Sequence, residues 1–164
     1  MKKVVFFVAT LFIALNVFAQ KEAKSVNLNL NFGTNIESIG IGGQFTYNFS
    51  ERFRAAPDFT YFLENNNYKA WNLNLNAHYL FPLNDSKITI YPIAGFILTH
   101  WTSTIESTTE KSMFPSATRV GLNLGGGLQY DFSKVFFFRG ELKYNTAPDN
   151  YDQTVISAGI GFNF

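Results

Sequence analysis

The sequence contains no cysteine, which excludes disulfide bonds, thiolate metal sites and a cysteine nucleophile. Charge is also scarce: Asp, Glu, Lys and Arg together make up 15% of the 164 residues, against about 25% in an average soluble domain. The net charge is +1 and the basic residues are scattered, so we expect no nucleic-acid partner. What is abundant is apolar, with 46% hydrophobic and 18% aromatic residues, which argues against a disordered chain.

Long apolar runs are absent with one exception, at the amino terminus. Two lysines precede the apolar residues 4–15, and a small residue, Ala19, follows shortly afterwards. This order is typical of a secretory signal peptide, so we predict a signal peptide over residues 1–19 and an exported domain over residues 20–164. The alternative, a membrane anchor, is disfavoured because the run is shorter than the roughly 20 residues that a helical span needs.

Alternation of bulky and small or polar side chains dominates the exported part. In residues 154–164, Ile156, Ile160 and Phe162 alternate with small residues, which is the period-two signature of a β-strand. The same pattern recurs upstream. We predict eight strands, over residues 25–34, 39–49, 53–63, 71–81, 87–101, 120–132, 136–145 and 154–164. The alternation is poor in the fifth strand, so its facing stays open.

The connections between these strands also alternate. Those after the second, fourth and sixth strands are short, whereas those after the third, fifth and seventh are polar and include the longest, residues 102–116. Each strand is long enough to cross a bilayer at the usual tilt, which takes about 9–11 residues. The predicted fold class is therefore all-β, an eight-stranded antiparallel up-and-down transmembrane β-barrel.

The facing of the apolar set decides between two classes of barrel. A soluble carrier such as a lipocalin would hold its bulky apolar side chains inside. The interior of an eight-stranded barrel is only just wide enough for side chains to fill, so it suits the asparagine and glycine sets better than the Phe, Leu, Tyr and Trp sets. We expect the apolar set to face lipid, which a closed barrel permits because it leaves no strand edge unpaired.

Across residues 25–164 the pattern resembles the OmpA- and OmpX-like family of porin-like, eight-stranded outer-membrane β-barrels of Gram-negative bacteria. The last strand ends on an aromatic residue, Phe164, as the closing strand of that family does. The resemblance implies a monomer in the outer membrane, in contact with outer-membrane lipids and without a cofactor. It also implies insertion by the barrel-assembly machinery, which would read the C-terminal strand ending at Phe164.

Aromatic residues gather near the predicted barrel end that carries the short turns, as an interfacial girdle does. This set comprises Tyr47, Phe49, Phe53, Tyr79, Phe81, Tyr130, Phe132, Phe136, Phe162 and Phe164. A sparser second girdle is predicted near the other end from Tyr61, Trp71, Trp101 and Tyr144. The alternative is that these rings cap a soluble core, since amphipathic rings serve in both places.

The inward face carries charges that must pair, because an unpaired charge in a narrow lumen has a large desolvation penalty. The predicted lumen network comprises Arg54, Asp58, His78, Arg119, Gln129, Asp131, Arg139, Glu141 and Lys143. An odd-numbered turn through Ser133 and Lys134 would place Arg139, Glu141 and Lys143 opposite glycine, Asn123 or Gln129, which leave room for long side chains. We predict a plugged lumen; the alternative is an ion path lined by the same groups.

These features favour a structural or surface-interaction role through the extracellular loops. Two alternatives stay open: a narrow porin-like solute channel, and a lipid A-modifying enzyme. The second would need a catalytic constellation near the outer rim, for which His100, Ser103 and Glu106 are the candidates. Nothing in the sequence fixes their geometry, so we predict no catalytic residues, and the two histidines lack a third ligand at metal spacing.

Overall fold

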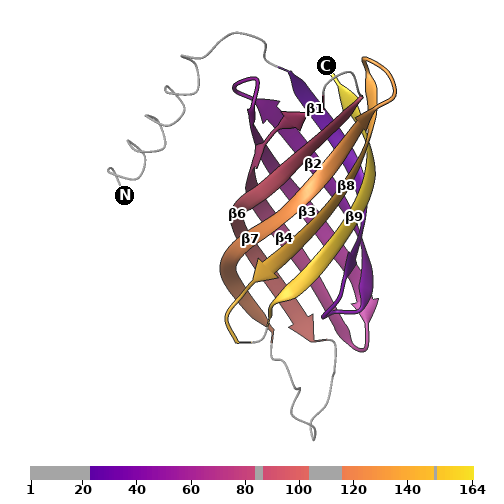
Figure 1. Cartoon of the computed structure of the whole chain (residues 1–164). Coiled ribbons are helices and arrows are strands. Elements are labelled where there is room, and N and C mark those ends of the chain that lie inside the picture. Colours follow the sequence, from indigo (N-terminus) through magenta and orange to yellow (C-terminus); the bar gives the residue numbers. More distant parts are fainter. Residues whose placement is uncertain (1–22, 84–86, 104–115, 150) are drawn as a thin grey trace, which may run out of the picture.

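The structure is a computed structural model that describes residues 23–83, 87–103, 116–149 and 151–164. Within them, one antiparallel sheet closes into a barrel (Figure 1). Its strands are β1 (Lys24–Gly33), β2 (Ser38–Asn48), β3 (Phe53–Asn65), β4 (Tyr68–Tyr79), β5 (Phe81–Pro82), β6 (Ile88–Ser103), β7 (Ala117–Asp131), β8 (Phe136–Thr146) and β9 (Gln153–Asn163). No helix in the described residues is long and apolar enough to cross a membrane. The predicted signal peptide, residues 1–19, lies outside them.

Every long strand pairs with two neighbours, which closes the wall. β1 pairs with both β2 and β9, and β4 pairs with β6, while the two-residue β5 continues the pairing of β4 along β6. The predicted eight-stranded up-and-down barrel is thereby confirmed. The start of β1 lies beside the end of β9, with Ser25 opposite Asn163 (Figure 1). We call this the near end of the barrel and the opposite one the far end.

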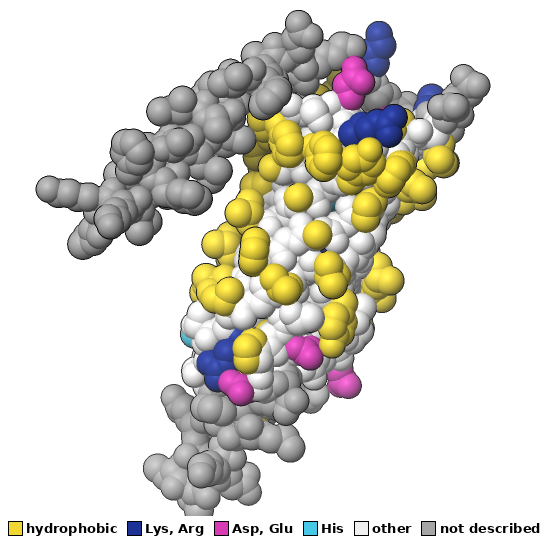
Figure 2. All heavy atoms as spheres, turned by 60° about the vertical axis from the view of Figure 1, so that its left-hand side comes forward, with side chains coloured by type: hydrophobic (Ala, Val, Ile, Leu, Met, Phe, Trp, Pro, Cys, Tyr) yellow, Lys and Arg dark blue, Asp and Glu magenta, His cyan; other side chains and the backbone are white. Residues whose placement is uncertain are grey.

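Side-chain facing follows the predicted rule around most of the wall. On β1, Asn27, Asn29 and Asn31 are buried, whereas Leu28 and Leu30 between them are 76% and 64% exposed. Figure 2 shows apolar side chains over the wall between charged side chains at the two ends. A closed sheet with an apolar outer face leaves no backbone group unpaired in hydrocarbon. The expectation that apolar residues face outward is therefore correct.

β6 departs most from this rule. Four of its inward positions hold apolar side chains, Tyr91, Ile93, Ile97 and Trp101, whereas its inward Thr99 is polar. The prediction that Trp101 belongs to an outer girdle was wrong, because its indole is only 4% exposed and packs edge-on against Tyr151, with 5.5 Å between ring centroids.

Small residues on the neighbouring strand explain why bulky β6 side chains fit inside. β7 places Gly127, Gly125, Gly121 and Ala117 directly opposite Tyr91, Ile93, Ile97 and Trp101 respectively. A large side chain on one strand thus lies beside a small one on the next, which keeps the narrow interior filled without overlap. The volume argument from sequence holds for the barrel as a whole but not for each strand.

The far-end hairpin between β3 and β4 is tighter than predicted. The polar loop expected over residues 64–69 is a two-residue turn at Asn66 and Asn67, whose φ angles are 49° and 65°. Positive φ at both central residues is the hairpin geometry that asparagine tolerates. The strands therefore extend to Asn65 and Tyr68. Most of the longest predicted loop, residues 104–115, lies outside the described residues.

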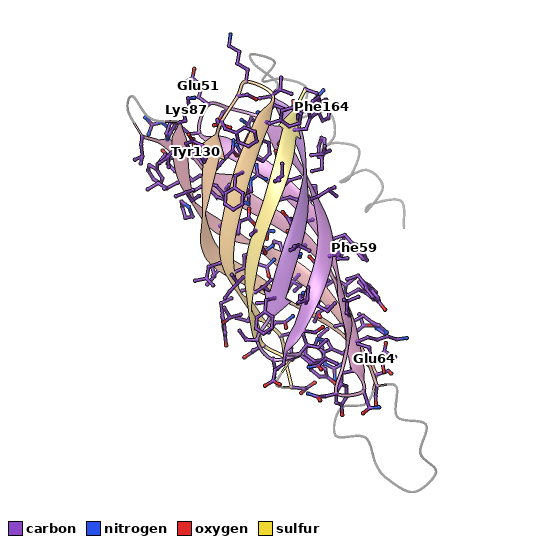
Figure 3. The ribbon with its side chains drawn as sticks, turned by 90° about the vertical axis from the view of Figure 1, so that its right-hand side faces the viewer. Glu51, Phe59, Glu64, Lys87, Tyr130 and Phe164 are labelled. Atoms are coloured by element: carbon purple, nitrogen blue, oxygen red, sulfur yellow. The ribbon has the colours of Figure 1, made fainter. Side chains whose placement is uncertain are left out.

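The near-end girdle is a set of touching rings on the outer surface. Phe53 packs edge-on against Tyr79 with 4.9 Å between centroids, and Phe136 packs against Phe162 at 5.7 Å. Phe162 in turn stacks on Phe164 at 6.2 Å, and Figure 3 shows Phe164 at this end of the wall. A band of aromatic rings at one level of a barrel is typical of a membrane–water interface.

Two adjacent glycines on β7 give a matched test of how tightly the interior is packed. A Cβ at Gly125 would point inward and overlap the carbonyl oxygen of Leu142, whereas a Cβ at Gly126 would point outward, 3.6 Å from the nearest atom, the carbonyl oxygen of Tyr91. We expect Gly125→Ala to lower the free energy of unfolding by about 1–3 kcal/mol, as overpacking does, and Gly126→Ala to change it little. Urea unfolding in lipid vesicles measures both, and equal effects would contradict this packing.

Candidate functional site

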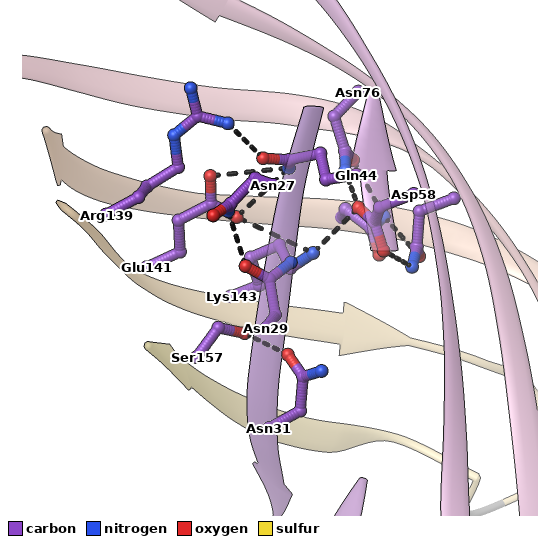
Figure 4. A network of polar contacts seen from close by, with 12 residues as sticks. Asn27, Asn29, Asn31, Gln44, Asp58, Asn76, Arg139, Glu141, Lys143 and Ser157 are labelled. Carbon is purple, nitrogen blue, oxygen red and sulfur yellow. Dashed lines mark hydrogen bonds and ion pairs between the residues drawn. The ribbon is translucent and has the colours of Figure 1, made fainter. Parts of the chain in front are cut away.

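A buried ion pair lies at the centre of the barrel. Lys143 of β8 reaches across the lumen to Asp58 of β3, with Nζ 2.9 Å from Oδ2, and its Nζ is 3.8 Å from Oε2 of Glu141 (Figure 4). All three side chains are at least nine-tenths buried. A buried pair is stable only when hydrogen bonds satisfy the remaining polar atoms, so the surrounding amides decide whether this pair is tolerated.

Asparagines supply those hydrogen bonds. Asn74 and Asn76 of β4 donate from Nδ2 to the two Asp58 oxygens, at 2.6 and 2.8 Å. Asn123 of β7 donates to the Oδ1 atoms of Asn74 and Asn76, both at 2.8 Å. With Lys143, the Asp58 carboxylate therefore accepts three donors. These hydrogen bonds replace the water that the carboxylate loses on burial.

Glu141 is held from two other strands. The Tyr91 hydroxyl of β6 donates to its Oε1 at 3.0 Å, and the Gln44 amide of β2 lies 3.4 Å from both carboxylate oxygens. The Gln44 Oε1 in turn accepts from Nη1 of Arg139 (Figure 4). Polar groups from opposite walls are thus joined through the middle of the lumen.

Two arginines meet toward the near end. Arg54 and Arg139 each donate to the same atom, Oε1 of Gln129, at 2.9 Å. Arg54 also donates from Nε to Asn48 Oδ1 at 2.8 Å, and the Arg139 guanidinium lies 4.7 Å from the centroid of the Phe137 ring. Both arginines are at least 95% buried. Their direct partners are amides and rings rather than carboxylates.

The structure places most of the predicted lumen residues inside the barrel, with two at its mouths. Arg54, Asp58, His78, Gln129, Arg139, Glu141 and Lys143 are all buried. Asp131 lies half-buried at the near mouth and accepts from Gln129 Nε2 at 2.8 Å. The expectation for Arg119 was wrong: its side chain is 32% exposed and pairs with Asp149 at 2.8 Å, at the far rim and away from the buried network.

His78 is buried without a polar partner. Its ring stacks on Tyr91, with 4.6 Å between centroids, and neither of its nitrogens contacts a polar atom of the described residues. It therefore packs beside the network rather than joining it.

The predicted cross-strand neighbours of the β8 charges are largely correct. On β7, Arg139 lies opposite Gln129, Glu141 opposite Gly127 and Lys143 opposite Gly125. The glycines leave the volume that the long charged side chains occupy. Register and composition therefore agree on this side of β8.

The network also contains residues that the sequence did not single out, chiefly Gln44 and Tyr91. Gln44 is one polar residue among many on an alternating strand. Tyr91 lies on the strand without clear alternation, so its inward facing carried no signal. The asparagine face of β4 was visible as a lumen lining, but its contact with Asp58 depends on the β3–β4 register.

The two ends of the lumen differ in character. Toward the far end it is filled by a cluster of buried apolar residues: Ile36, Phe62, Ala70, Trp101, Ala117, Ala147, Tyr151 and Val155. We call this cluster the far-end seal. At the near end a cavity of about 720 Å³ opens, which we call the vestibule. It is lined by Ala23, Asn48, Glu51, Arg54, Leu80, Pro82, Lys87, Thr89, Gln129, Asp131, Ser133, Lys134 and Asn163.

The structure describes only part of the constellation considered for chemistry at the outer rim. His100 lies on the outer wall, stacked on Trp71 with 5.5 Å between centroids, and its Nδ1 is 2.7 Å from Oγ1 of Thr118. Glu106 lies outside the described residues. Within those residues, no group of three or more His, Asp or Glu side chains could hold a metal ion.

A closed antiparallel wall with an apolar outer face, a near-end girdle of aromatic rings and buried polar groups inside define this chain as a transmembrane β-barrel. It belongs to the family described as "Outer membrane protein beta-barrel domain", which matches residues 5–164. No curated protein sequence matches the chain.

Among solved structures, the chain is similar to the N-terminal β-barrel domain of Pseudomonas aeruginosa OprF, with a TM-score of 0.73 and 19% identity over 88% of this chain and 100% of that one. Neisserial surface protein A (NspA) gives a TM-score of 0.64 at 15% identity, over 87% of this chain and 96% of that one. A third similar structure is that of Ail, the attachment invasion locus protein of Yersinia pestis, in complex with the heparin analogue sucrose octasulfate. Its TM-score is 0.63 at 16% identity, over 88% of this chain and 100% of that one. At these identities the likeness shows the fold alone.

Proposed function

We propose that the protein is an integral outer-membrane barrel with a plugged lumen, which acts as a structural or surface-interaction protein rather than as a pore. Its near end faces the periplasm and its far end the outside. The observation that carries the proposal is the filled interior: the Asp58–Lys143 network occupies the middle and the far-end seal closes one mouth. A solute would have to displace fully buried side chains such as Phe62 and Arg139.

Surface interaction would use the far-end rim, which carries the β1–β2, β3–β4 and β8–β9 connections. Ail is named for attachment and invasion, and NspA is named a surface protein. Their folds support the same general use of a barrel here, namely as a rigid platform that presents loops. No catalytic role is proposed, because His100 hydrogen-bonds a threonine rather than an acidic partner.

The proposed partners in the membrane follow from the same surface. Outer-membrane lipids would cover the apolar wall of a monomer, with the near-end girdle at the periplasmic interface. The barrel-assembly machinery would act on β9, whose pairing with β1 closes the wall and whose strand leads to Phe164. Closure by these two strands would be the last step of insertion.

Planar-bilayer recordings test the plug. We expect purified, folded protein to give no steady conductance steps, because the lumen offers no continuous polar path through the far-end seal. The preparation must first show the folded state by a mobility shift on heating in detergent, so that silence does not reflect unfolded protein. Reproducible steps of constant size would contradict the plugged lumen and favour the narrow channel.

A further inference from the structure

The buried charges of the lumen do not balance. Among the described residues at least nine-tenths buried there, three are cations, Arg54, Arg139 and Lys143, and two are carboxylates, Asp58 and Glu141. The ion pairs of the lumen both use Lys143, which contacts Asp58 at 2.9 Å and Glu141 at 3.8 Å. This leaves an excess of one positive charge, and it falls on the two arginines because neither of them contacts a carboxylate directly.

Gln129 brings these arginines together. Its single Oε1 accepts from both guanidinium groups at 2.9 Å, so two like charges converge on a neutral oxygen. Asp131 fixes the amide in this orientation by accepting from Nε2 at 2.8 Å. Asp131 lies half-buried at the mouth, and its carboxylate contacts the Gln129 amide rather than the arginines. The arginines therefore share the Gln129 oxygen, an acceptor with only a partial negative charge. Buried cations in this state gain strongly from an anion.

Arg54 is also the buried cation that an outside ligand can reach. It lines the vestibule, a cavity of about 720 Å³, beside Asn48, Thr89 and Gln129. Lys87 and Lys134 lie on the same lining. With Arg54 they give the vestibule three cationic side chains, against two carboxylates, those of Glu51 and Asp131. The far-end seal blocks the opposite route. Any ligand of Arg54 must therefore enter by the near end.

We propose that the vestibule binds a small oxyanion, a phosphate or carboxylate group, with Arg54 as its main ligand. A guanidinium offers a planar fork of donors that matches both groups. The Asn48 and Thr89 side chains and Lys87 complete a polar lining for the remaining oxygens. The site lies in the mouth of the lumen rather than on the apolar wall, so it takes a free or polymer-borne oxyanion in preference to the headgroup of a lipid.

Thermal unfolding in detergent tests the site, because a ligand that binds only the folded state raises the midpoint. Inorganic phosphate should raise the midpoint saturably relative to sodium chloride of equal ionic strength, and sodium acetate should do so more weakly. Arg54→Gln should lower the apparent affinity for phosphate at least tenfold. Arg52→Gln is the matched control: Arg52 lies at the same end, but its guanidinium contacts Tyr79 and it does not line the vestibule. Its phosphate response should equal that of the wild type.

Gln129→Glu provides a second variant of nearly the same shape. Its carboxylate would give both arginines an internal counter-ion, so the phosphate response should vanish. The midpoint in chloride is not the readout, because the variant also loses the hydrogen bond that the Gln129 amide donates to Asp131. A wild type that responds equally to phosphate and chloride overturns the proposal, as does a full phosphate response in Gln129→Glu.

Micelles containing phosphatidylglycerol form the lipid arm of the experiment. A midpoint shift in these micelles without a shift in free phosphate would assign the effect to lipid headgroups instead. Conductance measurements test only the plugged lumen, so failure of that proposal can be distinguished from failure of the anion site.

Discussion

Asp58→Asn is expected to lower the free energy of unfolding by about 3–5 kcal/mol, the largest effect of any single substitution considered for this barrel. The change keeps the shape of the side chain but removes the charge that Lys143 contacts at 2.9 Å. It also replaces an acceptor of two asparagine amides with a group that carries its own donors. Lys143 would then rely on Glu141, 3.8 Å away. Urea unfolding in lipid vesicles, followed by gel mobility, measures the loss.

The double variant with Lys143→Met separates the lost charge pair from general damage. Removing both partners leaves no unpaired buried ammonium, so we expect Asp58→Asn/Lys143→Met to be more stable than Asp58→Asn alone. The coupling free energy from this double-mutant cycle should favour the native pair by about 0.5–3 kcal/mol, the range for residues in direct contact. Simple additivity of the two single changes would mean that the lumen network does not depend on this pair.

The fold was predictable from sequence because alternation carries both strand position and facing. On β1 and β9 a single period-two pattern gives each residue's side of the wall, and the structure agrees from Leu28 to Phe162. β6 was not predictable in this way, because its inward residues Tyr91 and Trp101 are as bulky as its outward ones. Their facing depends on the glycines opposite them on β7, a property of two strands that neither strand reveals alone.

The identity of the charged lumen residues was visible, but their partners were not. Lys143 and Asp58 are 85 positions apart and come from strands that do not pair with each other. Their contact depends on the register of every intervening strand and on the barrel diameter. A shift of one residue in any register would move a whole strand's polar set to the lipid face, so the network can be read only from the closed barrel.

The polar groups inside the barrel differ in whether an external ligand can reach them. Asp58, Glu141 and Lys143 are buried in the middle of the lumen, where Lys143, neighbouring amides and the Tyr91 hydroxyl satisfy the two carboxylates. Arg54 lies at the boundary of the vestibule, where an external partner can approach. On the proposal made above, the charge imbalance that costs stability in a sealed core would favour anion binding at an open mouth. A barrel whose lumen is plugged, as we propose, would then still bind ligands from the side of its near end.

The last prediction tests whether the apolar wall faces lipid. Leu124 lies in the middle of β7 and is 57% exposed, beside Ala94 and Tyr144 on the neighbouring strands. We expect Leu124→Arg to lower the free energy of unfolding in lipid vesicles by about 2–4 kcal/mol, the cost of a basic residue near the bilayer midplane. Val120→Arg is the depth control on the same face of the same strand, nearer the far rim, where the cost falls to about 0–1 kcal/mol. If both variants unfolded at the wild-type urea concentration, hydrocarbon would not surround this wall. A bilayer imposes a steep dependence on depth because arginine near the rim can extend its guanidinium to the headgroups, whereas at mid-wall it cannot.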